Sequence, residues 1–258
     1  MSKAEDRRQD IADYVMRHGQ IRIEELVSHF GVSRMTIHRH VEQLAQQGVI
    51  RKLHGMVTVL PSGVYESTFR YRQSIGRAEK EALARAAMAH VEAGQVVMLD
   101  DSSTAGAAAP FLAEVKPLTV ITNSIHAGNV LTEAEDIDFI CLGGQYHPTY
   151  NAYIGLLCEN AIARLNANLL ICSASAVSGG IAYIQDQHVV RVKQAMMRAC
   201  RKRILLLEAS KFDKIALHAL DELTAFDAVL VSDGLDAAVA RQLQETGVRL
   251  QIVKTVTA

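Results

Sequence analysis

Apolar residues near the start of the chain recur at helical spacing in three short segments. The apolar positions are, in chain order, Ile11, Tyr14 and Val15; Ile23, Leu26, Val27 and Phe30; and Ile37, Val41 and Leu44. A glycine closes each segment, at positions 19, 31 and 48. The hydroxyl of Ser33 is well placed to cap the third helix. The pattern therefore predicts three helices, with a tight turn between the second and the third.

The character of the chain changes after the third helical segment. Residues 49–53 and 56–60 alternate imperfectly between apolar and polar positions, and His54-Gly55 between them favours a turn. This pattern predicts a β-hairpin. The polar stretch 61–76 begins with Pro61-Ser62-Gly63 and has few apolar anchors. We predict a small domain over 1–60, a linker over 61–76 and a larger domain over 77–258.

Short apolar runs alternate with amphipathic segments from residue 75 onward. The predicted helices are 79–91, 105–113, 125–132, 155–165, 189–201 and 237–245, and the predicted strands are 96–99, 118–121, 137–142, 169–172, 203–207, 228–231 and 248–253. Apolar strands that alternate with helices are typical of a mostly parallel sheet that is covered on both faces. The larger domain is therefore predicted to be α/β and Rossmann-like.

Composition and charge support a globular protein of two domains. The chain has 258 residues, of which 49% are hydrophobic and 21% charged. Its formal net charge is −1, but residues 1–60 carry nine Lys/Arg against seven Asp/Glu, so the first domain is mildly basic. The four cysteines lie far apart without zinc or haem spacing, and Cys141 and Cys172 fall in apolar runs that predict burial.

The start of the chain lacks an apolar leader, and no apolar run approaches the length of a membrane span. Together with the scattered free thiols, this predicts a cytoplasmic protein with no membrane partner and no bound cofactor.

Two helices joined by a tight turn and followed by a hairpin form the winged helix-turn-helix pattern, which binds DNA. Polar and basic side chains on the third helix and the hairpin are of the kind that contact phosphates and base edges. The candidate DNA contacts are Ser33, Arg34, Thr36, His38, Arg39, His40, Arg51, Lys52 and His54. A charged helix face is more often simply solvated, so the order of the elements carries the prediction of a double-stranded DNA partner.

These residues resemble a known family. The segment Val32-Ser33-Arg34-Met35-Thr36-Ile37-His38-Arg39-His40-Val41 is similar to the recognition helix of the DeoR family of bacterial sugar-metabolism regulators, which reads close to V-S-x-x-T-I-R-R-D-L. Arg51 and His54-Gly55 match the family's wing, R-x-H-G-G. The chain departs from the family pattern at His38, His40, Val41 and Met56. The resemblance implies a repressor of a carbohydrate operon that acts as a homo-oligomer, a dimer or a tetramer.

The resemblance continues through residues 75–253, where the family carries its sensor. The matching motifs are Leu99-Asp100-Asp101-Ser102-Ser103-Thr104, Thr122-Asn123-Ser124, Leu142-Gly143-Gly144, Gly155, Lys193, Glu208-Ala209-Ser210-Lys211-Phe212 and Asp233. The chain departs from the family at Ser102, where a glycine is usual, and at Glu208, where Asp is usual. The resemblance implies that the effector contacts are Asp100, Asp101, Ser102, Ser103, Thr104, Asn123, Ser124, Gly143, Gly144, Lys193, Lys211 and Asp233.

The chemistry of these residues is compatible with a phosphorylated sugar or a related intermediate, the effector that the resemblance implies. Hydroxyl groups ahead of a helix, with Lys193 and Lys211, suit a phosphate. The aspartates repel a phosphate and are better suited to sugar hydroxyls or to pairing with a lysine. The competing interpretations are that the hydroxyls are plain helix caps, that Lys193 is a solvated surface residue and that Gly143-Gly144 is only a turn.

Two other functions compete with ligand-controlled regulation. The family's sensor fold is shared with sugar-phosphate isomerases, so an isomerase or deaminase fused to a DNA-binding domain is the alternative, with Asp100, Asp101, Glu208 and Asp233 as candidate carboxylates. A regulator gains nothing by destroying its signal, so we predict no catalytic residues. A metal-responsive regulator ranks lowest because the ten histidines are scattered along the chain.

Overall fold

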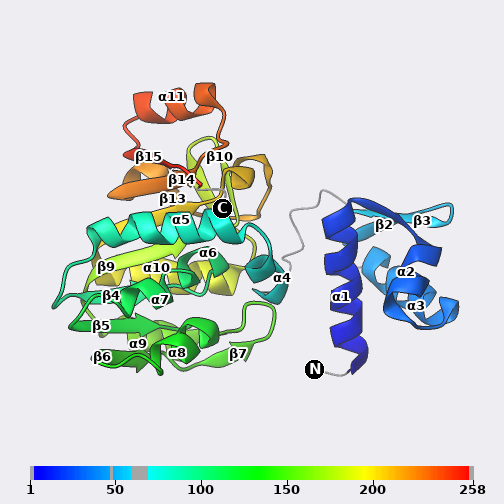
Figure 1. Ribbon diagram of the computed structural model, residues 1–258, viewed down its shortest axis with the longest axis horizontal. Helices are drawn as coiled ribbons and strands as arrows, with labels where there is room; N and C mark the ends of the chain where they lie inside the picture. The colour runs from blue at the N-terminus through cyan, green and yellow to red at the C-terminus, as the bar shows by residue number, and fades with distance from the viewer. Residues whose placement is uncertain (1–2, 47–48, 60–68, 256–258) are drawn as a thin grey trace. The chain divides into compact units, whose positions relative to one another are not determined.

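A computed structural model describes residues 3–46, 49–59 and 69–255, and its internal contacts divide the chain into two units, Met1–Tyr71 and Arg72–Ala258 (Figure 1). The first half of the linker predicted over 61–76 lies outside the described residues. Its last part is not an open coil, because residues Phe69–Ser74 form helix α4. The two units are described separately below.

The first unit is a three-helix fold with a small antiparallel sheet. Its elements are α1 (Lys3–His18), β1 (Gln20–Arg22), α2 (Ile23–Phe30), α3 (Arg34–Gln46), β2 (Ile50–Leu53) and β3 (Met56–Val59). The predicted apolar stripes meet in one core, where Ile11, Leu26 and Ile37 are fully buried. Gly31 ends α2 in the left-handed conformation, with φ of 61°, and its N–H donates to the carbonyl of Val27 at 3.0 Å.

The sheet of the first unit has one strand more than the predicted hairpin. Strands β2 and β3 form the expected antiparallel pair, with Ile50 opposite Val59. The short strand β1 adds to β3 on its other side, which gives the order β1-β3-β2. The unit is therefore a winged helix-turn-helix, in which α2 and α3 form the two-helix motif and β2–β3 the wing.

The second unit is built on a seven-stranded parallel sheet. Its strands are β4 (Val96–Leu99), β5 (Leu118–Thr122), β6 (Ile137–Cys141), β9 (Ala167–Ser173), β12 (Cys200–Leu207), β14 (Ala228–Ser232) and β15 (Leu250–Val253). They lie in the order β15-β14-β12-β9-β4-β5-β6, and every neighbouring pair is parallel. The prediction of a parallel α/β sheet is confirmed.

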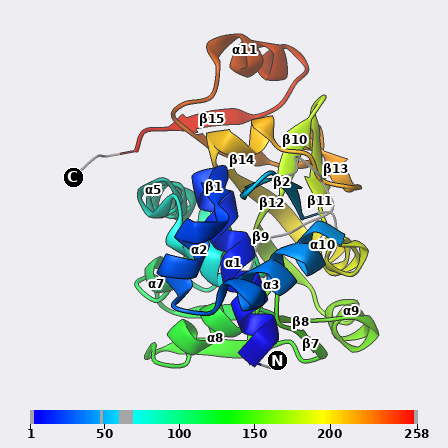
Figure 2. The same cartoon turned by 90° about the vertical axis from the view of Figure 1, so that its right-hand side faces the viewer.

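Helices cover both faces of this sheet (Figure 2). One face packs against α5 (Arg77–Ala87), α6 (Ser103–Gly106), α7 (Ala109–Leu112) and α8 (Ile125–Leu131), and the other against α9 (Leu156–Ile162) and α10 (Gln187–Ala199). Successive side chains of a strand point to opposite faces. Val97 and Leu99 therefore pack in the core on the side of α5, α6, α7 and α8, while Met98 between them packs in the core on the side of α9 and α10.

The structure also contains elements that the sequence did not predict. They are the antiparallel sheet of β10 (Ala176–Ser178), β11 (Ile181–Ile184) and β13 (His218–Glu222), the hairpin of β7 (Gln145–His147) and β8 (Ala152–Ile154), and the 3-10 helices η1 (Met88–His90), η2 (Ala209–Asp213) and η3 (Leu223–Ala225). Helix α11 (Ala237–Glu245) matches its prediction.

Two local predictions are wrong. The helix predicted over 105–113 is split into α6 and α7, each of four residues. Cys141 is exposed rather than buried, because β6 is the edge strand of the sheet and its last residues have no further strand beside them. Cys172, in an inner strand, is buried as predicted.

Candidate functional site

The parallel sheet changes its winding direction between β4 and β9. From β4 the chain continues to β5 and β6 on one side, whereas β9, β12, β14 and β15 extend the sheet on the other side. The loops that follow β4 and β9 therefore diverge, and open α/β sheets bind ligands in the crevice that such divergence creates. Asp100 and Asp101 follow β4 directly, and Ser173 is the last residue of β9.

A buried ion pair lies at this switch point. Lys193 extends from α10 with only 3% of its surface exposed, and its Nζ pairs with Asp100 and lies 3.7 Å from Asp101 Oδ1. Asp100 also accepts a hydrogen bond from the N–H of Ser173 at 3.0 Å. Burial would lower the pKa of Lys193, but the two carboxylates outweigh it and hold that pKa above its usual value. Lys193 is therefore not a solvated surface residue.

A second charged group lies beside the first. Lys211, on η2, donates to Ser173 Oγ at 2.7 Å and to Thr104 Oγ1 at 3.1 Å, and it pairs with Glu208 at 3.0 Å. Thr104 in turn donates to Glu208 at 2.8 Å. Burial would raise the pKa of Glu208, but Lys211 and Lys80 reverse this and lower it to about 2. The loop after β4 and the segment after β12 thus meet in one network.

Lys80 completes the cluster and was not predicted from the sequence. It lies in the first turns of α5, is 3% exposed, and its Nζ is 3.5 Å from Glu208 Oε1. Burial lowers the pKa of Lys80 to about 8, against the opposite effect of Glu208. The available signal was its spacing, because Lys80 shares the buried stripe of α5 with Leu83, Ala84 and Ala87. A lysine in such a stripe needs a buried partner.

The predicted hydroxyl residues act first as helix caps. Ser102 Oγ accepts from the N–H of Ala105 at 3.1 Å, and Ser124 Oγ accepts from that of Ala127 at 3.3 Å. Ser102 Oγ also donates to Asp100 at 2.5 Å. Because α6 has only four residues, its dipole is too short to form an anion site alone, so the positive charge comes from the lysines.

Several polar atoms near the switch point have no hydrogen-bond partner among the described residues. They include Asp101 Oδ1 and Asn123 Oδ1, whose residues are 2% and 0% exposed. Asn123 uses its Nδ2 to donate to the carbonyl of Tyr153 at 2.9 Å, which leaves its oxygen unpaired. Burial, opposed by Lys193, raises the pKa of Asp101. Buried acceptors of this kind normally bind a donor.

Three predicted residues lie apart from the network. Asp233 is exposed, and its carboxylate accepts from the N–H and hydroxyl of Thr255 at 2.9 and 2.5 Å. Gly143 is exposed, with no atom close to its missing side chain. Gly144 has a packing role, because a Cβ there would lie 2.6 Å from the carbonyl oxygen of Ile154. Ser103 is buried beside Thr104 at the start of α6.

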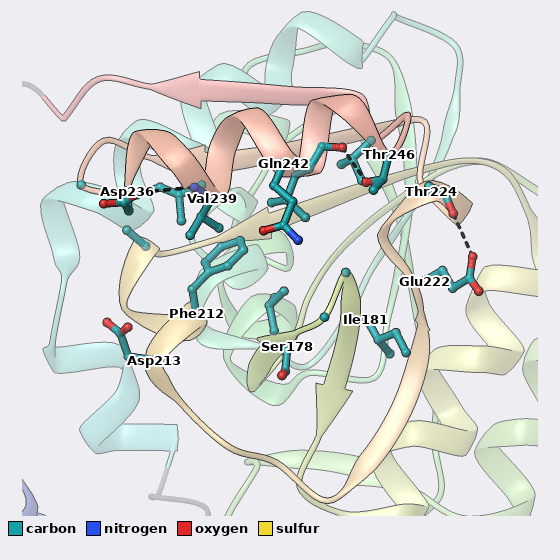
Figure 3. Close-up of a pocket in the computed structure, with 18 residues that line it drawn as sticks. Ser178, Ile181, Phe212, Asp213, Glu222, Thr224, Asp236, Val239, Gln242 and Thr246 are labelled. Atoms are coloured by element: carbon teal, nitrogen blue, oxygen red, sulfur yellow. Dashed lines mark hydrogen bonds between the residues drawn. The ribbon is translucent and has the colours of Figure 1, made fainter.

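A separate cavity of about 740 Å³ lies between α11 and the β10–β11 hairpin (Figure 3). Val239 and Gln242 of α11 face Phe212 and Ser178 across it, as Figure 3 shows. No predicted effector residue lines it, and the described lining residues include carboxylates but no basic group. A phosphate therefore fits the buried lysine cluster better than this cavity.

The predicted DNA contacts of the first unit are mostly exposed. Ser33 caps α3 as expected, with its Oγ accepting from the N–H of Thr36 at 3.2 Å. Arg34 pairs with Glu24 at 3.0 Å and Lys52 with Glu42 at 3.1 Å, and all four side chains are substantially exposed. The other exposed or half-buried predicted residues are Thr36, His38, Arg39, Arg51 and His54.

His40 does not lie on the exposed face that the sequence suggested. Only 2% of it is exposed, and its Nδ1 has no hydrogen-bond partner among the described residues. Burial, together with Arg39, Arg8 and Arg7, lowers its pKa. His40 is buried because it is three residues after Ile37 and so falls on the buried stripe of α3. Conversely, Met35 is 81% exposed on this helix and was not predicted as a contact.

The described residues form neither a metal site nor a membrane span. No group of three His, Cys, Asp or Glu residues in that part of the chain is arranged to hold a metal ion. Likewise, no helix within the described ranges is long and apolar enough to cross a membrane.

Similar proteins were found among curated sequences and among solved structures. The chain is 28% identical to the glycerol-3-phosphate regulon repressor of Escherichia coli, over 97% of this chain and 99% of the relative. It is 30% identical to the L-fucose operon activator of Haemophilus influenzae, over 85% and 88%. Ribose 5-phosphate isomerase from Methanocaldococcus jannaschii aligns with 16% identity and a TM-score of 0.39, over 53% of this chain and 54% of that one.

Two family models match successive parts of the chain. The DeoR-like helix-turn-helix domain matches residues 7–62, and the DeoR C terminal sensor domain matches residues 76–233. The second match alone covers more than half of the chain. The chain therefore belongs to the DeoR family of transcription regulators.

Proposed function

We propose that this protein represses a carbohydrate-utilisation operon in the cytoplasm and that a phosphorylated sugar or related intermediate controls it. Its helix-turn-helix domain is a DNA-binding domain and its second domain is a sensor for a small molecule. Named relatives regulate a glycerol-3-phosphate regulon and an L-fucose operon, one as a repressor and one as an activator. We also propose that the DNA-binding domain spans residues 1–60, the linker 61–76 and the sensor domain 77–258.

The observation that carries the choice of effector is the lysine cluster at the switch point. Three buried lysines at positions 80, 193 and 211 converge on it from α5, α10 and η2. Lys193 is committed to Asp100 and Asp101, as the sequence suggested for these aspartates, which leaves Lys80 and Lys211 as the phosphate-binding cations. A phosphate there takes the place of the contact that Lys211 now makes to Glu208.

Two buried acceptors that lack a hydrogen bond suggest where the other end of the effector binds. Asp101 Oδ1 and Asn123 Oδ1 are buried oxygens that need donors. Hydroxyl groups of a sugar or polyol supply such donors. We therefore assign the hydroxyl end to these two oxygens and the phosphate end to Lys80, Lys211 and the hydroxyls of Ser103 and Thr104. Asp233, Gly143 and Gly144 are left out of the proposed contacts.

On the DNA side, we propose that α3 enters the major groove and the wing lies near the backbone. The proposed contacts are Ser33, Arg34, Thr36, His38 and Arg39 on α3 and Arg51, Lys52 and His54 on the wing, without His40. Helix-turn-helix proteins commonly bind paired half-sites as symmetric oligomers. We propose a homo-oligomer, a dimer or a tetramer, with one recognition helix for each half-site.

A gel-shift titration tests the proposal. The purified protein is titrated onto DNA from upstream of its own and neighbouring genes, with and without triose, pentose and hexose phosphates and their unphosphorylated forms. We expect specific binding that one phosphorylated compound weakens and its unphosphorylated form does not. A compound that the protein consumes, without specific binding to any fragment, would instead support the isomerase or deaminase alternative.

A further inference from the structure

Lys80 connects the effector site to the start of the sensor unit through its three ammonium hydrogens. Its Nζ donates to the backbone carbonyls of Arg72 and Ile75, the latter at 2.8 Å, and lies 3.5 Å from Glu208 Oε1. An ammonium group has three N–H donors, and these three acceptors use all of them. A phosphate oxygen can therefore bind Lys80 only by displacing at least one acceptor.

The segment that Lys80 holds is the one that leads back along the chain to the DNA-binding unit. Residues Arg72–Ile75 include the end of α4 and precede α5 directly (Figure 1). Gly76, between this segment and α5, has a φ of 59°, in the left-handed region that favours glycine. The chain thus turns through a left-handed residue just before the helix that carries Lys80.

Two further contacts hold the same segment against the sensor. Gln73 Nε2 lies 2.8 Å from His126 Nε2 on α8, and the Arg72 guanidinium lies over the ring of Tyr150 at 5.4 Å. The charge of Arg72 also acts on the carboxyl of Asp101. The segment therefore contacts Lys80 on the phosphate side of the proposed effector site and acts electrostatically on Asp101 on its hydroxyl side.

We propose that Lys80 is a latch, which fastens residues Arg72–Ile75 to the sensor when the site is empty and releases them when a phosphate binds. The proposal rests on the proposed function, because it needs an anion at Lys80. A phosphate oxygen is a charged acceptor and binds an ammonium more strongly than a neutral carbonyl does. The ammonium turns toward the anion, and the carbonyls of Arg72 and Ile75 lose their donor. Effector binding thereby loosens the segment through which the chain leads to the DNA-binding unit.

Hydrogen–deuterium exchange on the full chain tests the latch, with inorganic phosphate as the probe. In the wild type, phosphate is expected to speed exchange roughly tenfold in peptides that cover residues 69–80, because hydrogen bonds to a charged donor are lost. Lys80→Met is expected to show the fast exchange without phosphate and no further change with it. Slow wild-type-like exchange in Lys80→Met, or no effect of phosphate on the wild type, would overturn the latch.

Two variants separate a latch from general damage to the site. Lys211→Met removes a cation from the same cluster and leaves the bonds of Lys80 to the carbonyls of Arg72 and Ile75 in place, so slow exchange without phosphate and a weakened response to it are expected. Gln73→Ala removes the contact between Gln73 and His126 and leaves every lysine in place. This variant is expected to exchange faster in residues 69–80, and phosphate is expected to speed its exchange further. If phosphate has no effect on Gln73→Ala, that result counts against Lys80 as the residue that responds to the anion.

The exchange readout also distinguishes failure of the latch from failure of the proposed function. If a sugar phosphate releases the DNA while exchange in residues 69–80 stays constant, the latch is wrong and the proposed function stands. If phosphate speeds exchange there while no sugar phosphate changes DNA binding, the latch stands and the proposed function is wrong.

Discussion

Burial separates the predicted side chains that the structure gathers at the switch point from one that it packs inside the first unit. Lys193 and Lys211 were predicted on motifs, and both lie in the buried network around Asp100, Glu208 and Ser173. His40 was predicted on the same kind of motif but packs inside the first unit. A motif gives the residue type and its place in the sequence, whereas the helix phase decides the direction of the side chain. A lysine or histidine on an apolar stripe is the signal that a motif search overlooks.

Arg39 provides a direct test of the DNA surface. Arg39→Ala is expected to weaken binding to every DNA sequence and to reduce the slope of log affinity against log salt by about one, because one phosphate contact is lost. Affinity is measured at several salt concentrations. Arg85→Ala is the matched control, since Arg85 is an exposed sensor residue that pairs with Glu81, and its slope is expected to stay unchanged. An unchanged slope in Arg39→Ala would remove this residue from the phosphate contacts.

Lys211 provides the corresponding test of the effector site. Lys211→Met is expected to weaken binding of the sugar phosphate by roughly 10- to 100-fold, as expected for loss of a hydrogen bond to a charged group, and to leave operator affinity intact. Calorimetric titration measures the first quantity and gel shift the second. Lys214→Met, which alters an exposed lysine three residues later, is the control. Equal effector affinity in the two variants would show that Lys211 lies outside the site.

Among the helices and strands, sequence periodicity predicted the long and regular ones. The inner parallel strands are continuous apolar runs, and their order along the chain is recognisable without a structure. The short antiparallel strands β10, β11 and β13 have three to five residues each and lack a period long enough to detect. The gathering of Lys80, Lys193 and Lys211 could not be predicted either, because it depends on which strands become neighbours at the switch point.

Gly144 shows how one such unpredicted element is held in place. It precedes β7 and approaches the end of β8 so closely that a Cβ would lie 2.6 Å from the carbonyl oxygen of Ile154. Gly144→Ala is expected to lower the free energy of unfolding by about 1–3 kcal/mol, measured by chemical denaturation. Gly143→Ala, at the neighbouring position with open space around it, is expected to have little effect. Equal stabilities would show that the hairpin adapts and that this glycine is not required.

The whole molecule consists of two units, and each has its own core. The first unit carries the DNA-binding helix and the second carries the buried lysine cluster. A regulator needs the ligand to favour one state of the protein over another, and coupling between two binding sites is reciprocal. The effector must therefore change DNA affinity, and DNA must change effector affinity by the same factor.

Effector affinity in the presence and absence of operator DNA is the measurement that tests the central claim most directly. Calorimetry with the compound found by gel shift gives both values, and an unrelated DNA fragment serves as the control. We expect operator DNA to weaken effector binding by the same factor by which the effector weakens operator binding, on the order of 5- to 150-fold. An effector that binds with equal affinity with and without the operator would contradict it.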